Sequence, residues 1–178
     1  MAERNILAIA FLLVAQVAWS LQNEPRGYGE AQFGMSVEAT RRIFPDLKQV
    51  GATPVEKGPA SLAIYSLANQ SFLGLSACDV GFRFYVDQLY EVTFDCGSSE
   101  KVMQALRKRF GEPGSLQAGA TYWRGEKTVI GLIEKTHKFA FSDIALNNNV
   151  QAALLQYVLT QGWKQGGATG PTPAVTPQ

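Results

Sequence analysis

The two cysteines are the residues of this sequence best suited to chemistry, and they stand at the ends of one run, CDVGFRFYVDQLYEVTFDC, residues 78 to 96. A pair of thiols can form a disulfide, ligate a metal or act as a redox dithiol. The spacing is too wide for a redox motif, and two thiolates with a single histidine make a poor zinc site. We therefore expect a structural disulfide between Cys78 and Cys96, with two reduced core cysteines as the alternative.

The run between the cysteines alternates aromatic or branched residues with polar ones, as a β-hairpin does. With Asp87 at the centre of the turn, paired residue numbers sum to 174, which places Cys78 opposite Cys96. The same register places Arg83 opposite Glu91, a favourable pair of opposite charges. One face of the hairpin then carries Phe82, Phe84, Tyr90, Val92 and Phe94.

Two carboxylates flank the cysteines and face each other in this register. Asp79 and Asp95 lie on the polar side of the hairpin, where like charges opposite each other cost stability. They could bind a cation or a basic partner residue; the alternative is that the strand ends splay and water solvates both side chains. The other acidic residues are too scattered to complete a calcium site, so we expect no bound metal.

Motifs for catalysis are absent from the sequence. It contains no nucleophile elbow, no phosphate-binding glycine loop and no HExxH. The single histidine, His137, stands in an expected turn between lysines, where a surface role is the more common one. We expect a protein that is not an enzyme and that has no cofactor.

The strands and turns that position these residues are predicted from the alternation of apolar and polar residues and from turn-forming residues such as Gly, Pro, Asn and Asp. Strands are expected over 61–68, 72–87 and 88–96, with turns at Asn69-Gln70 and at Asp87, while residues 49–60 read as a loop. Two or three more strands are expected over 120–125, 127–135 and 138–146.

Three helices are expected around these strands. The first has Ser36 as its N-cap and ends at Pro45. The second starts at Ser98 or Ser99 and stops at Gly111, and the third runs from Asn147 or Asn148 to Gln161. Short connections between strands require antiparallel pairing. The predicted fold is therefore α+β in two layers: an antiparallel sheet of five to six strands with two to three helices mainly on one face, in the order α-βββ-α-ββ(β)-α.

Some apolar residues fall on the face of the sheet that the expected register turns outward. They are Tyr65, Leu67, Tyr85 and Leu89. A partly aromatic outer face suits the binding of a protein partner. The alternative is that the C-terminal helix or the N-terminal lead-in segment covers it.

The two ends of the chain predict export and a tail. Residues 1–20 have a short polar start, an apolar run and small residues near Ser20, which is typical of a signal peptide; a retained membrane anchor is the alternative. Residues 165–178 are rich in Gly, Pro and Thr and read as a disordered tail, or as a tether or proline-rich ligand. A single α+β domain over 21–164 lies between them. We expect a periplasmic or secreted protein without stable membrane insertion after signal cleavage.

Composition excludes some classes of partner. The chain of 178 residues has 46% hydrophobic and 17% charged residues and a net charge of +1, with its basic residues scattered. This balance fits one globular domain and lacks the basic patch of a nucleic-acid binder.

The phrases FGMSVEATRRIFPDL, FLGLSACDVGFRFYVDQLYEVTF and LRKRFGEPG together resemble a group of small exported bacterial proteins. This two-layer group includes BamE-type envelope lipoproteins and β-lactamase-inhibitor-like domains. The resemblance implies a binding or assembly module that contacts another envelope or extracellular protein. It carries over no functional residue, and the chain lacks a lipid-modified cysteine. The alternative function is a small-molecule carrier or hydrolase with a pocket between sheet and helices.

Overall fold

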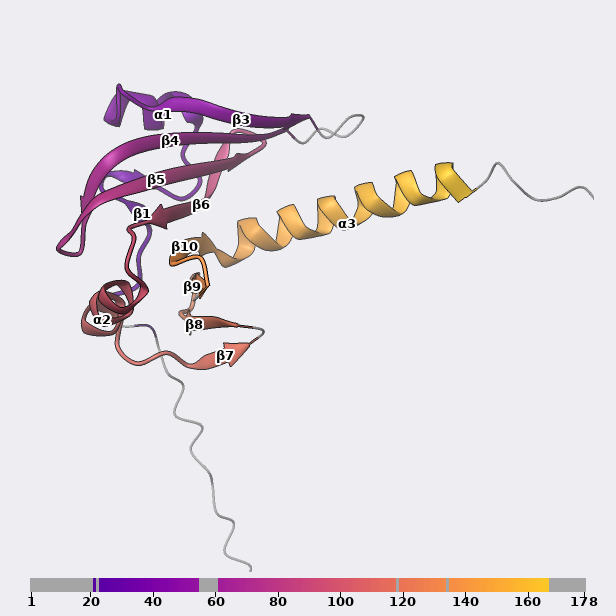
Figure 1. The fold of residues 1–178 in the computed structure, drawn as a ribbon. Helices are drawn as coiled ribbons and strands as arrows, with labels where there is room; N and C mark the ends of the chain where they lie inside the picture. The colour runs from indigo at the N-terminus through magenta and orange to yellow at the C-terminus, as the bar shows by residue number, and fades with distance from the viewer. Residues whose placement is uncertain (1–20, 22, 55–60, 118, 134, 167–178) are drawn as a thin grey trace, which may run out of the picture.

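The fold is α+β, as the sequence predicts, with three helices and an antiparallel sheet (Figure 1). The computed structural model describes residues 21, 23–54, 61–117, 119–133 and 135–166. The expected signal peptide over 1–20 and residues 167–178 of the expected tail lie outside this part. No helix in the described ranges combines the length and the hydropathy needed to cross a membrane.

The main sheet has eight strands in the order β3-β4-β5-β6-β10-β9-β8-β7, more than the five to six expected. A separate two-stranded hairpin, β1-β2, precedes it in the chain. The strands are β1 Gly27–Tyr28, β2 Ala31–Gln32, β3 Lys48–Pro54, β4 Ser61–Phe72, β5 Leu75–Tyr85, β6 Gln88–Asp95, β7 Ser115–Gln117, β8 Ala120–Arg124, β9 Thr128–Ile133 and β10 Lys138–Asp143. The helices are α1 Val37–Ile43, α2 Ser99–Phe110 and α3 Ile144–Gly166.

The predicted hairpin register is confirmed over most of β5 and β6. Arg83 lies opposite Glu91, and Asp79 lies opposite Asp95. Near the turn the register shifts by one residue, so that Phe84 pairs with Leu89 instead of Tyr90. The cause is a two-residue turn at Val86 and Asp87, both with positive φ, followed by one extra residue in β6.

The expected turn at Asn69-Gln70 is wrong, because β4 continues to Phe72. The chain reverses at Leu73 and Gly74, which have φ values of 51° and 78°. Asn69 also has a left-handed backbone, with φ 58°, but it lies in an irregular stretch of the β4–β5 ladder. The left-handed preference of Asn thus serves a bulge here, and glycine takes the turn.

Two other expectations need correction. The first half of the stretch expected as a loop over 49–60 belongs to β3, which tolerates Gly51 and Pro54 because it lies at the edge of the sheet. Residues 55–60 lie outside the described part.

The expected strand over 138–146 stops at Asp143, whose Oδ1 accepts a hydrogen bond from the Leu146 N–H at 2.8 Å. This cap starts α3 several residues before the expected Asn147.

Helices α1 and α2 follow their sequence signals. Ser36 Oγ accepts a hydrogen bond from the Ala39 N–H at 3.1 Å, as expected of an N-cap. Helix α2 ends at Gly111, whose φ is 86° and whose carbonyl accepts a 2.7 Å hydrogen bond from the Trp123 indole. Its apolar side chains Val102, Leu106 and Phe110 are buried in the core.

Aromatic rings fill the core between the sheet and these helices. Phe94 stacks on Phe139 with ring centroids 4.6 Å apart, and on Phe72 at 4.5 Å. Tyr28 from β1 and Phe44 from the end of α1 both reach Phe82 on β5, at 6.0 and 5.5 Å. The face that the sequence predicts as aromatic is therefore the buried face of the sheet.

The segment before β1 fastens the N-terminal side of the domain to the far end of the sheet. Glu24 accepts hydrogen bonds from the backbone N–H groups of Lys127, in the β8–β9 connection, and of Thr128, the first residue of β9. The Asn23 side-chain amide donates to the Arg109 carbonyl at 3.3 Å. No helix or strand was predicted for this lead-in.

Candidate functional site

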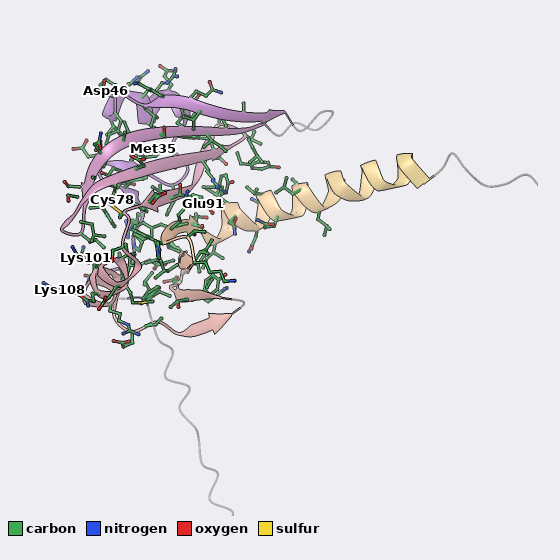
Figure 2. The ribbon with its side chains drawn as sticks, in the orientation of Figure 1. Met35, Asp46, Cys78, Glu91, Lys101 and Lys108 are labelled. Carbon is green, nitrogen blue, oxygen red and sulfur yellow. A yellow bond between two sulfur atoms is a disulfide. The ribbon has the colours of Figure 1, made fainter. Side chains whose placement is uncertain are left out.

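The two cysteines form the predicted disulfide. Their Cα atoms lie 4.2 Å apart across the open end of the β5–β6 hairpin, and no cysteine of the chain is free. Cys78 is fully buried beside the aromatic core (Figure 2). The pair is therefore structural, and it offers no free thiol for chemistry.

Asp79 and Asp95 face each other as predicted, but the chain itself supplies partners for both. Asp95 forms an ion pair with Lys138 of β10 at 3.2 Å, and Asp79 Oδ1 accepts a hydrogen bond from the Asn69 N–H at 3.3 Å. Within the described ranges, no cluster of three or more metal-ligating side chains occurs. The basic residue beside Asp95 thus comes from this chain itself and not from a partner.

The four predicted partner-binding residues do not share an exposed face. Tyr65, Leu67 and Leu89 are buried in the core, and only Tyr85 is partly exposed. Both faces of β4 carry two apolar residues, Leu62 and Ile64 on one and Tyr65 and Leu67 on the other, so alternation could not choose between them.

Leu89 moves to the core because of the extra residue in β6. It pairs with Phe84 and exchanges backbone hydrogen bonds with Gly34 and Met35 at 2.8 and 2.9 Å.

A polar cluster occupies the outer face of the sheet where β5, β6 and β10 meet. Arg83 Nη1 lies 3.1 Å from Glu91 Oε1, and the Ser142 hydroxyl donates to Glu91 Oε2 at 3.0 Å. Burial and the Glu91 charge raise the pKa of the neighbouring Tyr90 hydroxyl, while Arg83 acts in the opposite direction. The cluster satisfies its own charges, which favours a structural role.

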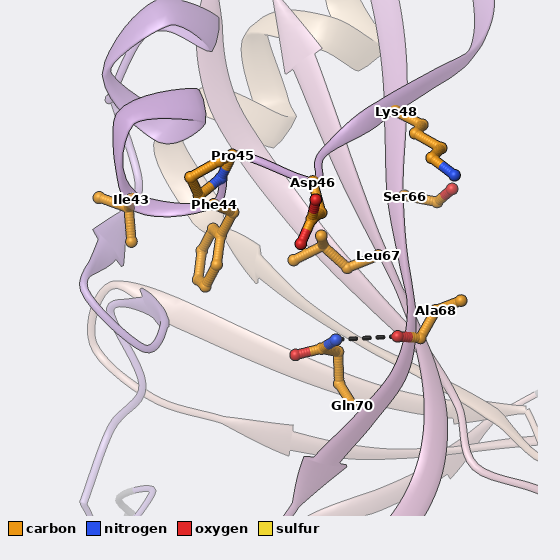
Figure 3. Close-up of a pocket in the computed structure, with 9 residues that line it drawn as sticks. All are labelled: Ile43, Phe44, Pro45, Asp46, Lys48, Ser66, Leu67, Ala68 and Gln70. Atoms are coloured by element: carbon orange, nitrogen blue, oxygen red, sulfur yellow. Dashed lines mark hydrogen bonds between the residues drawn. The ribbon is translucent and has the colours of Figure 1, made fainter.

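A cleft opens between the end of α1 and the edge of the sheet (Figure 3). Its volume is about 360 Å³. Its lining residues are Ile43, Phe44, Pro45, Asp46, Lys48, Ser66, Leu67, Ala68 and Gln70. We refer to this cleft, defined by these nine residues, as the edge notch.

The edge notch exists because β4 is longer than its neighbour. Strand β3 begins at Lys48, which pairs with Ser66, whereas β4 continues to Phe72. In the described part of the chain, no strand pairs with residues 67–72 on the β3 side. Pro45 ends α1 and turns the chain toward β3, so α1 closes the far wall of the notch.

The lining of the edge notch combines apolar and polar groups. Leu67 forms the buried floor and Phe44 is half-buried, while Asp46 and Lys48 are exposed and carry opposite charges. In Figure 3 the Asp46 carboxylate points into the notch. The Gln70 side-chain amide donates to the Ala68 carbonyl at 2.8 Å. Such a mixture suits binding through shape, backbone hydrogen bonds and a few polar contacts.

Sequence reasoning missed this site because it missed β3 and placed the β4 turn too early. The signals were present in part: Pro45 marks the end of α1, and Asn69 marks irregular backbone. His137, the single histidine of the chain, lies in the β9–β10 turn with φ 58° and is not part of the notch.

Comparison with known proteins gives one result. A sequence model of the TP0088 domain matches residues 26–153. The match therefore covers the sheet and ends inside α3. Among curated proteins, a search found no match for this sequence.

Proposed function

This chain belongs to the family of the TP0088 domain, and we propose that it is a non-enzymatic binding module. In this proposal it is exported, and it holds an extended segment of an envelope or extracellular protein in the edge notch. The segment pairs with the free part of β4 and places an apolar side chain against Phe44 and Leu67.

The unpaired edge of β4 is the observation that carries the proposal. Extended peptides bind to sheet edges by adding a strand, because the unpaired backbone N–H and C=O groups of the edge give affinity and a neighbouring pocket gives specificity. Residues 67–70 provide an edge without a strand partner on the β3 side, although the Ala68 carbonyl and the Asn69 N–H already have side-chain partners in Gln70 and Asp79. The lining residues from Ile43 to Lys48 provide the pocket. The opposite charges of Asp46 and Lys48 would orient the segment by its own charges.

The free edge of β3 is a weaker candidate for the same role. Its register shifts around Val50, which is 63% exposed, and its ends carry Lys48 and Pro54. A bulge, a lysine and a proline are devices by which edge strands avoid pairing with other chains. The outer face is also weaker, because its Arg83–Glu91 pair is already satisfied.

Export is supported by the disulfide, since such bonds persist in oxidising compartments. The expected signal peptide agrees with this location. The resemblance to BamE-type lipoproteins and β-lactamase-inhibitor-like domains supports a binding or assembly role, which the proposal adopts.

The proposal is tested by filling the notch. Asp46 is exposed and its side chain points into the notch (Figure 3), so an Asp46→Trp variant should block the cleft without disturbing the core. Glu126→Trp, at an exposed residue between β8 and β9, is the matched control, because it also replaces one carboxylate by an indole. Peptides selected from a random display library with the purified chain are measured by fluorescence anisotropy. We expect Asp46→Trp to weaken binding at least about tenfold, or ~1.4 kcal/mol, and Glu126→Trp to leave it unchanged. Equal affinity for both variants would rule out the notch.

The edge notch also suits the second candidate function, a small-molecule carrier or hydrolase. Its volume falls within the range of ligand pockets, and Lys48 and Ser66 are cross-strand neighbours in its wall. A carrier would retain a ligand through purification. Native mass spectrometry of the chain and of Asp46→Trp tests this: a bound small molecule lost only in the variant would favour this function over peptide binding.

A further inference from the structure

The edge notch contains a carboxylate that has no partner in the described part of the chain. Asp46 is exposed, and in Figure 3 its side chain points into the notch. The carboxylates of Glu38, Glu91 and Asp95, by contrast, are each paired with a cation. An unpaired carboxylate in the wall of a cleft attracts a cationic group that enters the cleft.

The cations that lie near Asp46 in the sequence are directed elsewhere. Arg42 forms an ion pair with Glu38, and the Arg41 guanidinium lies over an aromatic ring of β4, 5.1 Å from its centroid. Lys48 lines the notch at the point where β3 begins, and in Figure 3 its side chain extends away from Asp46. The charge that faces the inside of the notch is therefore negative.

Apolar surface lies next to this carboxylate. Leu67 forms the floor of the notch and is 6% exposed, while Phe44 is half-buried in the wall. The Phe44 ring also packs against Tyr28 and Phe82, with ring centroids 5.7 and 5.5 Å away, so it is held in place by the core. A side chain that fits this lining is apolar along its length and positively charged at its end.

We propose that the notch binds an arginine or lysine side chain of the extended segment, an inference that rests on the proposed function. Both side chains bury an aliphatic stem on apolar surface and keep the cationic head near water. The stem lies on Leu67 and Phe44, and the head pairs with Asp46. Arginine fits best, because its guanidinium also stacks on aromatic rings and can donate two hydrogen bonds to one carboxylate.

Other kinds of side chain fit the notch less well. A purely apolar side chain would cover the Asp46 carboxylate without giving it a partner, and this costs part of its solvation. An acidic side chain would meet Asp46 as a like charge, with only Lys48 to compensate. The position of the segment that faces Asp46 is therefore expected to carry Arg or Lys.

A double-mutant cycle between the chain and its peptides tests this pairing. Peptides selected from the random library are resynthesised with citrulline, the neutral isostere of arginine, or with norleucine in place of lysine. Fluorescence anisotropy measures their affinities for the wild type, Asp46→Asn and Glu126→Gln. The last variant is the matched control, because it also replaces an exposed carboxylate by its amide.

We expect Arg or Lys to be enriched at one position of the selected peptides. Asp46→Asn should weaken binding of the arginine peptide at least about threefold, as for a solvent-exposed ion pair, and leave the citrulline peptide unchanged. Glu126→Gln should change neither affinity. Added salt should weaken the arginine peptide more than the citrulline peptide, because salt screens the pair.

The outcomes separate this inference from the proposed function. If Asp46→Trp blocks binding but Asp46→Asn changes the affinities of both peptides equally, or if no basic residue is enriched, the notch is the site and the basic side chain is wrong. Enrichment of Asp or Glu, with binding that Lys48→Gln weakens and Asp46→Asn does not, would also overturn the inference. If no peptide is selected, or if Asp46→Trp binds as well as the wild type, the proposed function fails and this inference fails with it.

Discussion

Replacing both cysteines with alanine should destabilise the domain by an amount set mainly by the unfolded chain. The Cys78–Cys96 bond joins two residues 18 positions apart. The hairpin that it closes is also held by its turn at Val86 and Asp87 and by the Arg83–Glu91 pair. We therefore expect the native register to survive without the bond.

The magnitude follows from loop closure. A cross-link over 18 residues removes about 11 cal/mol/K from the entropy of the unfolded chain, or about 3 kcal/mol at 25 °C. Cys78 is fully buried, so the loss of its sulfur contacts adds up to about 1 kcal/mol. The total expected loss is about 3–4 kcal/mol of the free energy of unfolding.

Urea denaturation monitored by far-UV circular dichroism measures this loss. The samples are the oxidised chain, the oxidised chain with added reductant, and the Cys78→Ala/Cys96→Ala variant with and without reductant. Reductant should destabilise the wild type and leave the variant unchanged. A loss below about 1 kcal/mol in the variant would refute the loop-closure reasoning. Likewise, no change in mass on reduction of the purified protein would show that the bond does not form.

Three further predictions concern single residues. Val86→Asn should stabilise the domain by about 1 kcal/mol in the same urea assay, because a β-branched residue with φ 48° is strained and Asn is not; a loss of stability would contradict this. Trp123→Phe should cost about 2 kcal/mol, because it leaves the Gly111 carbonyl without its indole donor; unchanged stability would show that the bond contributes little. Burial, with the Glu91 charge, raises the pKa of Tyr90 above its usual value near 10, so folding favours the protonated hydroxyl. That stabilisation is present below pH 10 and is lost as pH rises through the folded pKa, so Tyr90→Phe should flatten the loss of stability above pH 10; an unchanged alkaline profile would contradict it.

The hairpin between the cysteines was predictable because several independent features selected one register. The disulfide, the aromatic face and the Arg83–Glu91 pair all agree with it. The helix boundaries at Ser36 and Gly111 were predictable for a similar reason, since local capping chemistry determines them.

The elements that were mispredicted were not supported by several independent sequence features. Strand β3 reads as a loop because Gly51 and Pro54 are tolerated only at an edge, and the sequence does not say which strand is the edge. The extra residue beside Leu89 follows from tertiary contacts with Gly34 and Met35, which no local pattern encodes. The edge notch depends on β3 and on the length of β4, both of which the sequence mispredicted, so it could be found only from the fold.

The prediction of which β4 residues face outward was wrong, because the sequence pattern of this strand fits either face. Strand β4 is apolar on both faces, and the choice between Tyr65 and Ile64 for the core depends on pairing with β5. Tyr65 lies opposite Phe82 and takes the buried side, where the Arg41 guanidinium also lies over its ring at 5.1 Å. Non-local pairing of this kind is what a single sequence leaves open.

Hydrogen exchange of the β4 backbone tests the central proposal most directly. The purified chain is exchanged with and without a selected peptide, and protection is read at residues 67–72. Strand addition in the edge notch predicts that peptide slows exchange within 67–70, and that Asp46→Trp abolishes the effect. Slowed exchange confined to the outer-face residues of β5 and β6, with no change in 67–70, would contradict it.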